Sequence, residues 1–205
     1  MKDFAHIGLN VSRETLDRLD VFEKLLKKWN PAINLVSKST LEHAWDRHFL
    51  DSAQVFNIVG AQRGHWVDLG SGGGFPGVVC AIIAAERSPD MTFTLVESDQ
   101  RKSTFLRTVL RDVGVDAQVL AQRVEGVAPL SANVLTARAL SSLSNLLEFA
   151  DRHLDENGIA YFPKGEKFQQ ELDEARTAWR FSHKSHASVT DQNAVILEVG
   201  EIERV

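Results

Sequence analysis

The chain has 205 residues, of which 43% are hydrophobic and 25% are charged, the proportions of a globular protein with one buried core. Its 28 acidic and 23 basic side chains give a net charge of −5, so nucleic-acid binding would have to depend on a local cluster of cations. The longest uncharged apolar run, residues 78–85, is too short for a membrane helix, no secretory signal is visible, and one cysteine excludes an internal disulfide, which together predict a cytoplasmic protein.

The N-terminal part of the chain has the apolar spacing of helices. A first helix is predicted between an N-cap at Ser12 and a stop at Asn30-Pro31. Residues 39–42 have the spacing of a capping box, which predicts a second helix from Ser39 to about residue 55. We therefore expect residues 1–60 to form a helical N-terminal cap.

Residues 61–205 change to a rhythm of strand, turn and helix. Strands are expected at 65–69, 92–96, 117–120, 133–137, 158–162, 180–189 and 194–201, and helices at 78–86, 101–113, 143–154 and 166–179. Such alternation predicts a mostly parallel sheet with helices on both faces. The last two strands are joined through residues 191–193, so they must pair antiparallel, and we expect the sheet to end with a reversed strand. The prediction is one compact α/β domain with a Rossmann-like, seven-stranded sheet.

A glycine-rich turn, DLGSGGGFPG at residues 68–77, follows the first expected strand. Five of the eight residues 70–77 are glycine, more than a tight turn alone requires. Glycine allows positive φ angles and lets backbone N–H groups approach a ligand closely. Gly72, Gly74 and Gly77 match GxGxxG, which is weak by itself, but here it stands between a strand and a helix that begins near Pro76. The pattern predicts a nucleotide-binding turn.

The residues around this turn discriminate among three ligands. A phosphate-binding P-loop would need Lys-Ser or Lys-Thr after its last glycine, and this chain has Val78-Val79. A dinucleotide would bring its pyrophosphate near the carboxylate of Asp68, at the lip of the turn, and be repelled. The positive ammonium and sulfonium of S-adenosylmethionine would be attracted there. Glu97, at the end of the second strand, can accept both ribose hydroxyls of either ligand, so Asp68 alone favours the methyl donor.

Motifs that the chain lacks narrow the choice of methyl acceptor. The fourth strand is not followed by the Asp/Asn-Pro-Pro-aromatic motif of enzymes that methylate exocyclic amines. Methylation of pyrimidine carbon-5 needs a cysteine nucleophile, and Cys80 lies within an apolar run typical of a core. An acceptor that is already nucleophilic remains. Guanine N7 has a free lone pair and no proton, so alignment suffices and no general base is expected.

The segments DLGSGGGFPG, LVESDQRKSTFLR, QRVEG, TARAL and YFPKG, preceded by WNPAINLVS and RHFLDS, resemble the RsmG (GidB) family of 16S ribosomal RNA guanine-N7 methyltransferases. The resemblance extends over residues 25–170, and Gly126 is its one mild departure, where the family often has a second acid. It implies a class I fold dependent on S-adenosylmethionine. It also implies a target guanine in the 530-loop region of 16S rRNA in the small ribosomal subunit.

The resemblance further implies a donor pocket of Gly70, Phe75, Val124, Glu125 and Arg138. Gly70 would admit close backbone approach and Phe75 would cover part of the cofactor. Val124 would pack on adenine, whose amino group Glu125 would bind. Arg138 would hold the methionine carboxylate or an rRNA phosphate and position the reactants, although an ion pair with a nearby acid is the alternative. The expected cofactor-binding set is Asp68, Gly70, Gly72, Gly74, Phe75, Glu97, Val124, Glu125 and Arg138.

A local group of cations could bind the RNA that the net charge disfavours. The candidates are Lys27, Lys28, Arg47, His48 and Lys164, with Lys38. The alternatives are solvated lysines, a helical Arg47–Asp51 ion pair and a core position for His48. No histidine spacing predicts a metal site, and nothing demands more than a monomer. Two other functions stay open: a methyltransferase for a small molecule or protein, and a catalytically silent RNA-binding or assembly module.

Overall fold

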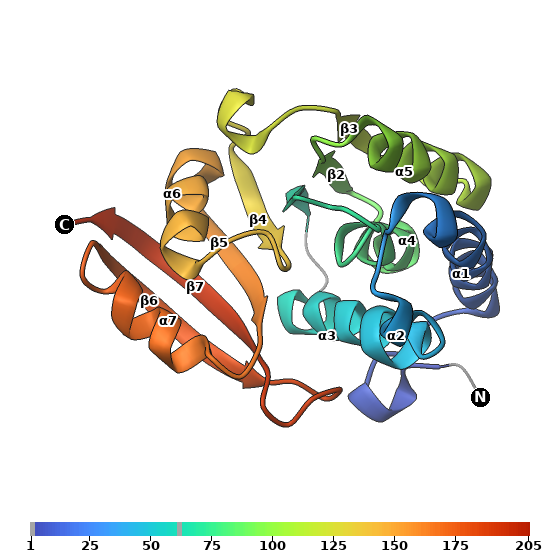
Figure 1. Ribbon diagram of the computed structural model, residues 1–205, viewed down its shortest axis with the longest axis horizontal. Helices are drawn as coiled ribbons and strands as arrows, with labels where there is room; N and C mark the ends of the chain where they lie inside the picture. Colours follow the sequence, from blue (N-terminus) through green and yellow to red (C-terminus); the bar gives the residue numbers. More distant parts are fainter. Residues whose placement is uncertain (1–2, 61–62) are drawn as a thin grey trace.

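A seven-stranded sheet forms the centre of the computed structural model, which describes residues 3–60 and 63–205 (Figure 1). Its strands are β1 Gly64–Leu69, β2 Met91–Val96, β3 Gln118–Leu120, β4 Ala132–Ala137, β5 Leu154–Lys164, β6 Trp179–Ala187 and β7 Val195–Arg204. The helices are α1 Arg13–Ile33, α2 Lys38–Leu41, α3 Leu50–Val59, α4 Gly77–Arg87, α5 Gln100–Val113, α6 Leu143–His153 and α7 Phe168–Ala175. Short helical turns occupy Ala5–Ile7, Trp45–Phe49 and Val124–Gly126. Every expected strand is present, and the last expected helix is shorter than predicted.

The strand order is β3-β2-β1-β4-β5-β7-β6, in which β7 alone runs against its neighbours. This confirms the Rossmann-like, mostly parallel sheet with one antiparallel strand. The expectation that the reversed strand ends the sheet is wrong, because β7 lies between β5 and β6. The strand order follows from which strand is apolar. In β7 the side chains of Ile196, Leu197 and Val199 are fully buried, whereas most residues of β6 are polar and suit the edge of a sheet.

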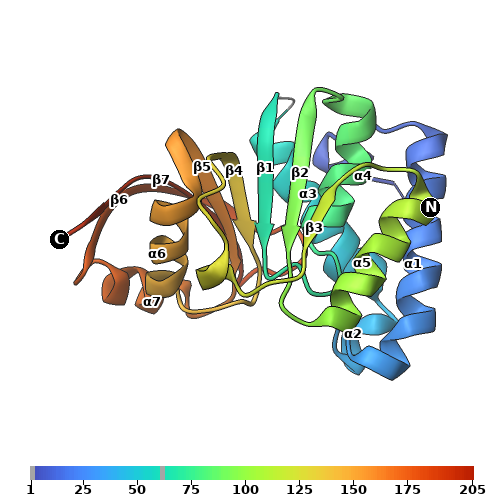
Figure 2. The same cartoon turned by 90° about the horizontal axis from the view of Figure 1, so that it is seen from above.

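Helices cover both faces of the sheet (Figure 2). On one face α3, α4 and α5 pack against the strands, with α1 outside them, and on the other face lie α6 and α7. Neighbouring residues of β1 point to opposite faces of the sheet and explain this arrangement. Trp66 packs in the apolar cluster on one face, and Val67 packs in the cluster on the other. A strand that is apolar on both sides must be covered on both sides.

The first helix of the cap begins as predicted and ends later. The Ser12 side chain caps α1 by accepting from the Thr15 N–H at 3.2 Å. The helix then continues through Pro31 to Ile33. The Asn30 side chain accepts from the N–H groups of Leu35 and Val36, both at 2.8 Å, and so holds the turn that follows the helix.

The second predicted helix is divided, and its predicted start is wrong. Its N-cap is Ser37, whose extended backbone and side-chain bond to the Thr40 N–H fulfil the capping role assigned to Ser39. The four residues of α2 are followed by a π-helical turn at Trp45–Phe49 and then by α3. Such π-turns are frequent at functional sites, and this one carries His48.

The cap and the sheet share one apolar core. Phe22 of α1 lies 5.0 Å from Phe49, 5.2 Å from Phe75 of the glycine-rich turn and 6.3 Å from Phe105 of α5, measured between ring centroids. The cap therefore packs directly on the turn that the sequence identifies as ligand-binding. The expected boundary between residues 60 and 61 falls beside residues 61–62, which lie outside the described residues. In the part of the chain that is described, no helix is long and apolar enough to cross a membrane.

Candidate functional site

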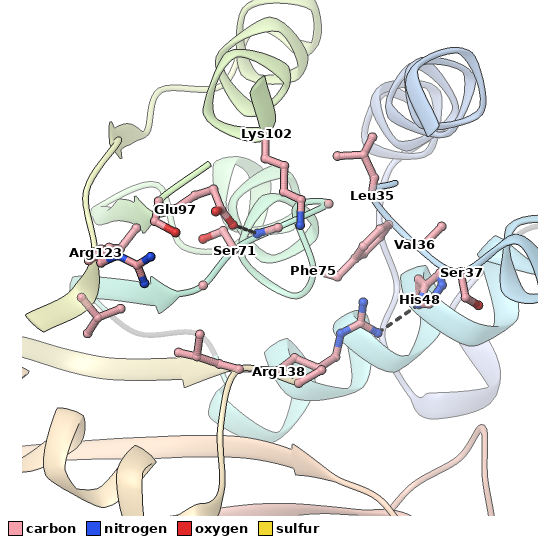
Figure 3. A pocket seen from close by; sticks show the side chains of 18 of the residues that line it. Leu35, Val36, Ser37, His48, Ser71, Phe75, Glu97, Lys102, Arg123 and Arg138 are labelled. Atoms are coloured by element: carbon pink, nitrogen blue, oxygen red, sulfur yellow. Dashed lines mark hydrogen bonds between the residues drawn. The ribbon is translucent and has the colours of Figure 1, made fainter. Parts of the chain in front are cut away.

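A cleft of about 600 Å³ opens at the carboxyl ends of β1, β2, β3 and β4 (Figure 3). This is the position at which open α/β sheets bind ligands, and the volume is in the range of small-molecule sites. The cap closes one side of it with Leu35, Val36 and His48. Most of the expected donor residues line it: Gly70, Gly72, Phe75, Glu97, Val124, Glu125 and Arg138. We refer to it as the donor cleft.

The glycines of the turn serve different purposes. The φ angles of Gly70, Gly72 and Gly74 are 66°, 53° and 90°, a region that glycine adopts without strain. A Cβ on Gly72 would lie 3.6 Å from the Gly70 carbonyl oxygen, an ordinary contact, so its backbone conformation and its place in the cleft are what call for glycine. A Cβ on Gly74 would lie 2.9 Å from Phe22 and 2.8 Å from Val78. Gly74 is absent from the cleft wall, contrary to its expected role, because it serves the packing of the cap.

Glu97 holds the glycine-rich turn in place. One carboxylate oxygen accepts from the Gly72 N–H at 2.8 Å and the other from the Asp99 N–H at 2.7 Å. The side chain is nearly buried but faces the donor cleft (Figure 3). Each carboxylate oxygen has a second lone pair, so Glu97 can accept ribose hydroxyls while it anchors the turn.

Asp68 is beneath the turn and not at its lip, which corrects the sequence-based expectation. Its side chain is fully buried and does not line the donor cleft. One oxygen accepts from the Thr136 hydroxyl at 2.7 Å, and the other has no hydrogen-bond partner among the described residues. Burial raises the pKa of Asp68 to about 6. The sequence could not show this depth, because it depends on α4 and β4 closing over the strand end.

Arg138 connects the sheet to the cap. Its Nη1 donates to Nδ1 of His48 at 3.0 Å and lies 3.6 Å from the carboxylate of Asp51. Its guanidinium carbon lies 5.1 Å from the ring centroid of Phe75. The alternative considered for Arg138, an ion pair, is thus present, and the guanidinium still lines the donor cleft. A hydrogen-bonded, charge-paired arginine of this kind is held in one orientation.

His48 is neutral, which does not fit its expected role as one of the RNA-binding cations. Arginine has only donors, which makes Nδ1 of His48 the acceptor and leaves Nε2–H to donate to the Thr40 hydroxyl at 2.9 Å. Burial, followed by the charge of Arg138, lowers the pKa of His48 to about 4. At pH 7 the imidazole is an uncharged support for Arg138.

The other expected RNA-binding cations are mostly paired. Lys164 lies 2.7 Å from Glu171 with an 8% exposed side chain, which does not fit the expected phosphate contact. Arg47 pairs with Asp191 at 3.5 Å and not with Asp51, so the helical pair considered for it is wrong. Lys27 pairs with Glu23 at 2.8 Å but remains exposed. Lys28 is exposed and has no ion-pair partner within the described ranges.

Two cations of the donor cleft were not among the expected site residues. Lys102 extends into it from the first turn of α5, and Arg123 from the loop after β3 (Figure 3). Both stand within segments that carry the resemblance, LVESDQRKSTFLR and QRVEG. Lys102 follows Glu97 by five positions, in the first turn of α5, and Arg123 directly precedes Val124. These neighbours are the signal by which the two cations could have been found.

Comparisons with known proteins agree with this geometry. A family model described as rRNA small subunit methyltransferase G (GidB) matches residues 15–198. Proteins named ribosomal RNA small subunit methyltransferase G are 52% identical over 201 residues in Ruegeria sp. strain TM1040, covering 98% of both chains, and 53% identical over 198 residues in Ruegeria pomeroyi, covering 96% of both. Among solved structures, a mutant of MtNAS in complex with S-adenosylmethionine has a TM-score of 0.60 at 16% identity, covering 90% of this chain and 75% of that one. A SAM-dependent methyltransferase from Aquifex aeolicus has a TM-score of 0.59 at 12% identity, covering 86% and 96%. These two likenesses show the fold.

Proposed function

Because the chain belongs to the rRNA small subunit methyltransferase G family, we propose that it transfers the methyl group of S-adenosylmethionine to N7 of a guanine in 16S rRNA. The observation that most supports this is the donor cleft, in which a glycine-rich turn, a strand-end carboxylate and a charge-paired arginine converge. The resemblance of the sequence motifs is the ground for placing the target in the 530-loop region. The protein would act in the cytoplasm as a monomer on the small ribosomal subunit.

The residues of the cleft fit S-adenosylmethionine. The donor supplies an electrophilic methyl group on a positively charged sulfonium. The backbone of Gly70 and Gly72 lines the cleft and would contact it beside the turn, and Glu97 would accept from its ribose hydroxyls. Val124 and Glu125 would hold its adenine, and Phe75 would cover part of it. Asp68 would act from below without contact, because its buried carboxylate favours a positive charge above the turn.

The acceptor side requires positioning rather than proton removal. Guanine N7 carries no proton, so methyl transfer needs no general base. His48 cannot act as a general base, because its unprotonated Nδ1 already accepts a hydrogen bond from Arg138. Arg138 would align the reactants, held by His48, Asp51 and Phe75. The family has rRNA as its named substrate, and we propose that Lys27 and Lys28 of α1 contact its phosphates.

We also propose that residues 1–60 act as a cap and residues 61–205 as the methyltransferase domain of one compact unit. The cap contributes Leu35, Val36 and His48 to the donor cleft and shares the core around Phe22. A chain without the cap would therefore lack one wall of its donor site.

Transfer of labelled methyl from S-adenosylmethionine to purified small ribosomal subunits tests the proposal. We expect label in 16S rRNA as 7-methylguanosine after digestion to nucleosides, and a loss of at least a hundredfold in rate for Arg138→Ala. The subunits should come from cells that lack this modification. Label in protein or in a small molecule would support another acceptor, and donor binding without any transfer would support a silent RNA-binding module.

A further inference from the structure

A second cleft, of about 410 Å³, adjoins the donor cleft. Thr40, His48, Arg138 and Ala139 line both, so the two clefts meet at these residues. The outer walls of the second cleft come from elsewhere in the chain: the end of β5 at 163–165, and the connection between β6 and β7 at 188–195. Its position places it beside the donor cleft on the side of Arg138, away from Glu97 and Val124.

The charged side chains of the second cleft balance one another. Each of its three cations is paired with a carboxylate that also lines it, at nitrogen–oxygen distances of 3.6 Å in Arg138–Asp51, 3.5 Å in Arg47–Asp191 and 2.7 Å in Lys164–Glu171. His48 adds no charge, because its ring accepts from Arg138. A phosphate would need cations without such partners. This surface instead offers donors and acceptors side by side with no net charge.

We propose that the second cleft receives the target guanine base, turned out of the rRNA, while the phosphates bind on other cations of the protein. The inference rests on the proposed function. Guanine is neutral, with N–H donors and an oxygen acceptor on its edges, and a flipped base is held by such polar groups in a closed pocket. The cleft volume is within the range of small-molecule sites, and the residues that line both clefts place its contents beside the donor cleft.

Filling the second cleft tests where the base enters. Gly165 lines it, has no positive φ, and a Cβ added there meets open space, so Gly165→Trp adds bulk without backbone strain. Ala194→Trp fills it from the connection between β6 and β7. Ala85→Trp is the matched control, on the exposed surface of α4 in the groove lined by residues of β2 and α4.

We expect both filled variants to bind S-adenosylmethionine within twofold of wild type by calorimetry and to methylate small subunits at least tenfold more slowly. Ala85→Trp should match wild type in both assays. Methylation at the wild-type rate by either filled variant with intact donor binding would overturn the proposal. Absence of 7-methylguanosine with the wild-type protein would instead overturn the proposed function.

The salt dependence of RNA binding shows whether the second cleft holds a base or a backbone phosphate. If Arg47 contacted a phosphate, Arg47→Gln would lower the log–log salt slope of binding by about 0.7–0.9. Because Arg47 is paired with Asp191 at the cleft, we expect no decrease. A decrease of that size would show that the cleft holds backbone and overturn the proposal.

Discussion

Replacing Asp68 with asparagine should change how the stability of the protein depends on pH. The folded state raises the pKa of this buried carboxyl from 3.8 to about 6, chiefly through desolvation. A group that holds its proton more tightly when folded stabilises the fold fully below pH 3.8, and this stabilisation is lost as pH rises through 6. At about 1.4 kcal/mol for each pH unit, the difference corresponds to about 3 kcal/mol. Asparagine has a similar shape and does not titrate.

Urea unfolding of wild type and Asp68→Asn from pH 4.5 to 7.5 measures this effect. The free energy of unfolding of the variant, minus that of wild type, should rise by about 2 kcal/mol across that range. The rise does not depend on the constant cost of exchanging an oxygen for an amide nitrogen. Saturating S-adenosylmethionine should reduce it, because a positive charge above the turn favours the ionised carboxylate. Parallel curves for the two proteins would refute the reasoning.

Three further outcomes are expected at the donor cleft. Gly72→Val should abolish donor binding in calorimetry, since a β-branched residue is strained at a φ of 53°, and wild-type affinity would contradict this. Glu97→Gln removes a charged acceptor and should weaken donor binding by about tenfold to a hundredfold, whereas an unchanged dissociation constant would exclude a contact with the ribose. The single-turnover rate of methyl transfer should be flat from pH 7 to 9, because guanine N7 has no proton, the pKa of His48 is about 4 and that of Asp68 about 6. A bell-shaped profile would instead indicate proton abstraction from another acceptor.

The features that could be read from the chain depend on residues close together in it. The rhythm of strand, turn and helix predicted all seven strands, and the glycine-rich turn after the first strand identified the ligand site. Even so, the start predicted at Ser39 was wrong and Ser37 is the N-cap, because several hydroxyls near a helix start compete and the backbone conformation selects one. The reversed strand was expected but its place was not, since apolar β7 had to displace polar β6 from the interior.

Local sequence patterns were least informative about the protonation and ion pairing of charged side chains. Asp68 and His48 have ordinary sequence surroundings, and only their burial and neighbours make one a weak acid and the other a neutral ring. Arg47 meets Asp191 from 144 positions away, in preference to the acid one helical turn along. The strands and the glycine-rich turn thus follow from short-range order in the sequence. Which cations are free and which are paired follows from the packing of distant segments, because desolvation and ion pairing depend on distances in space that no spacing along the chain expresses.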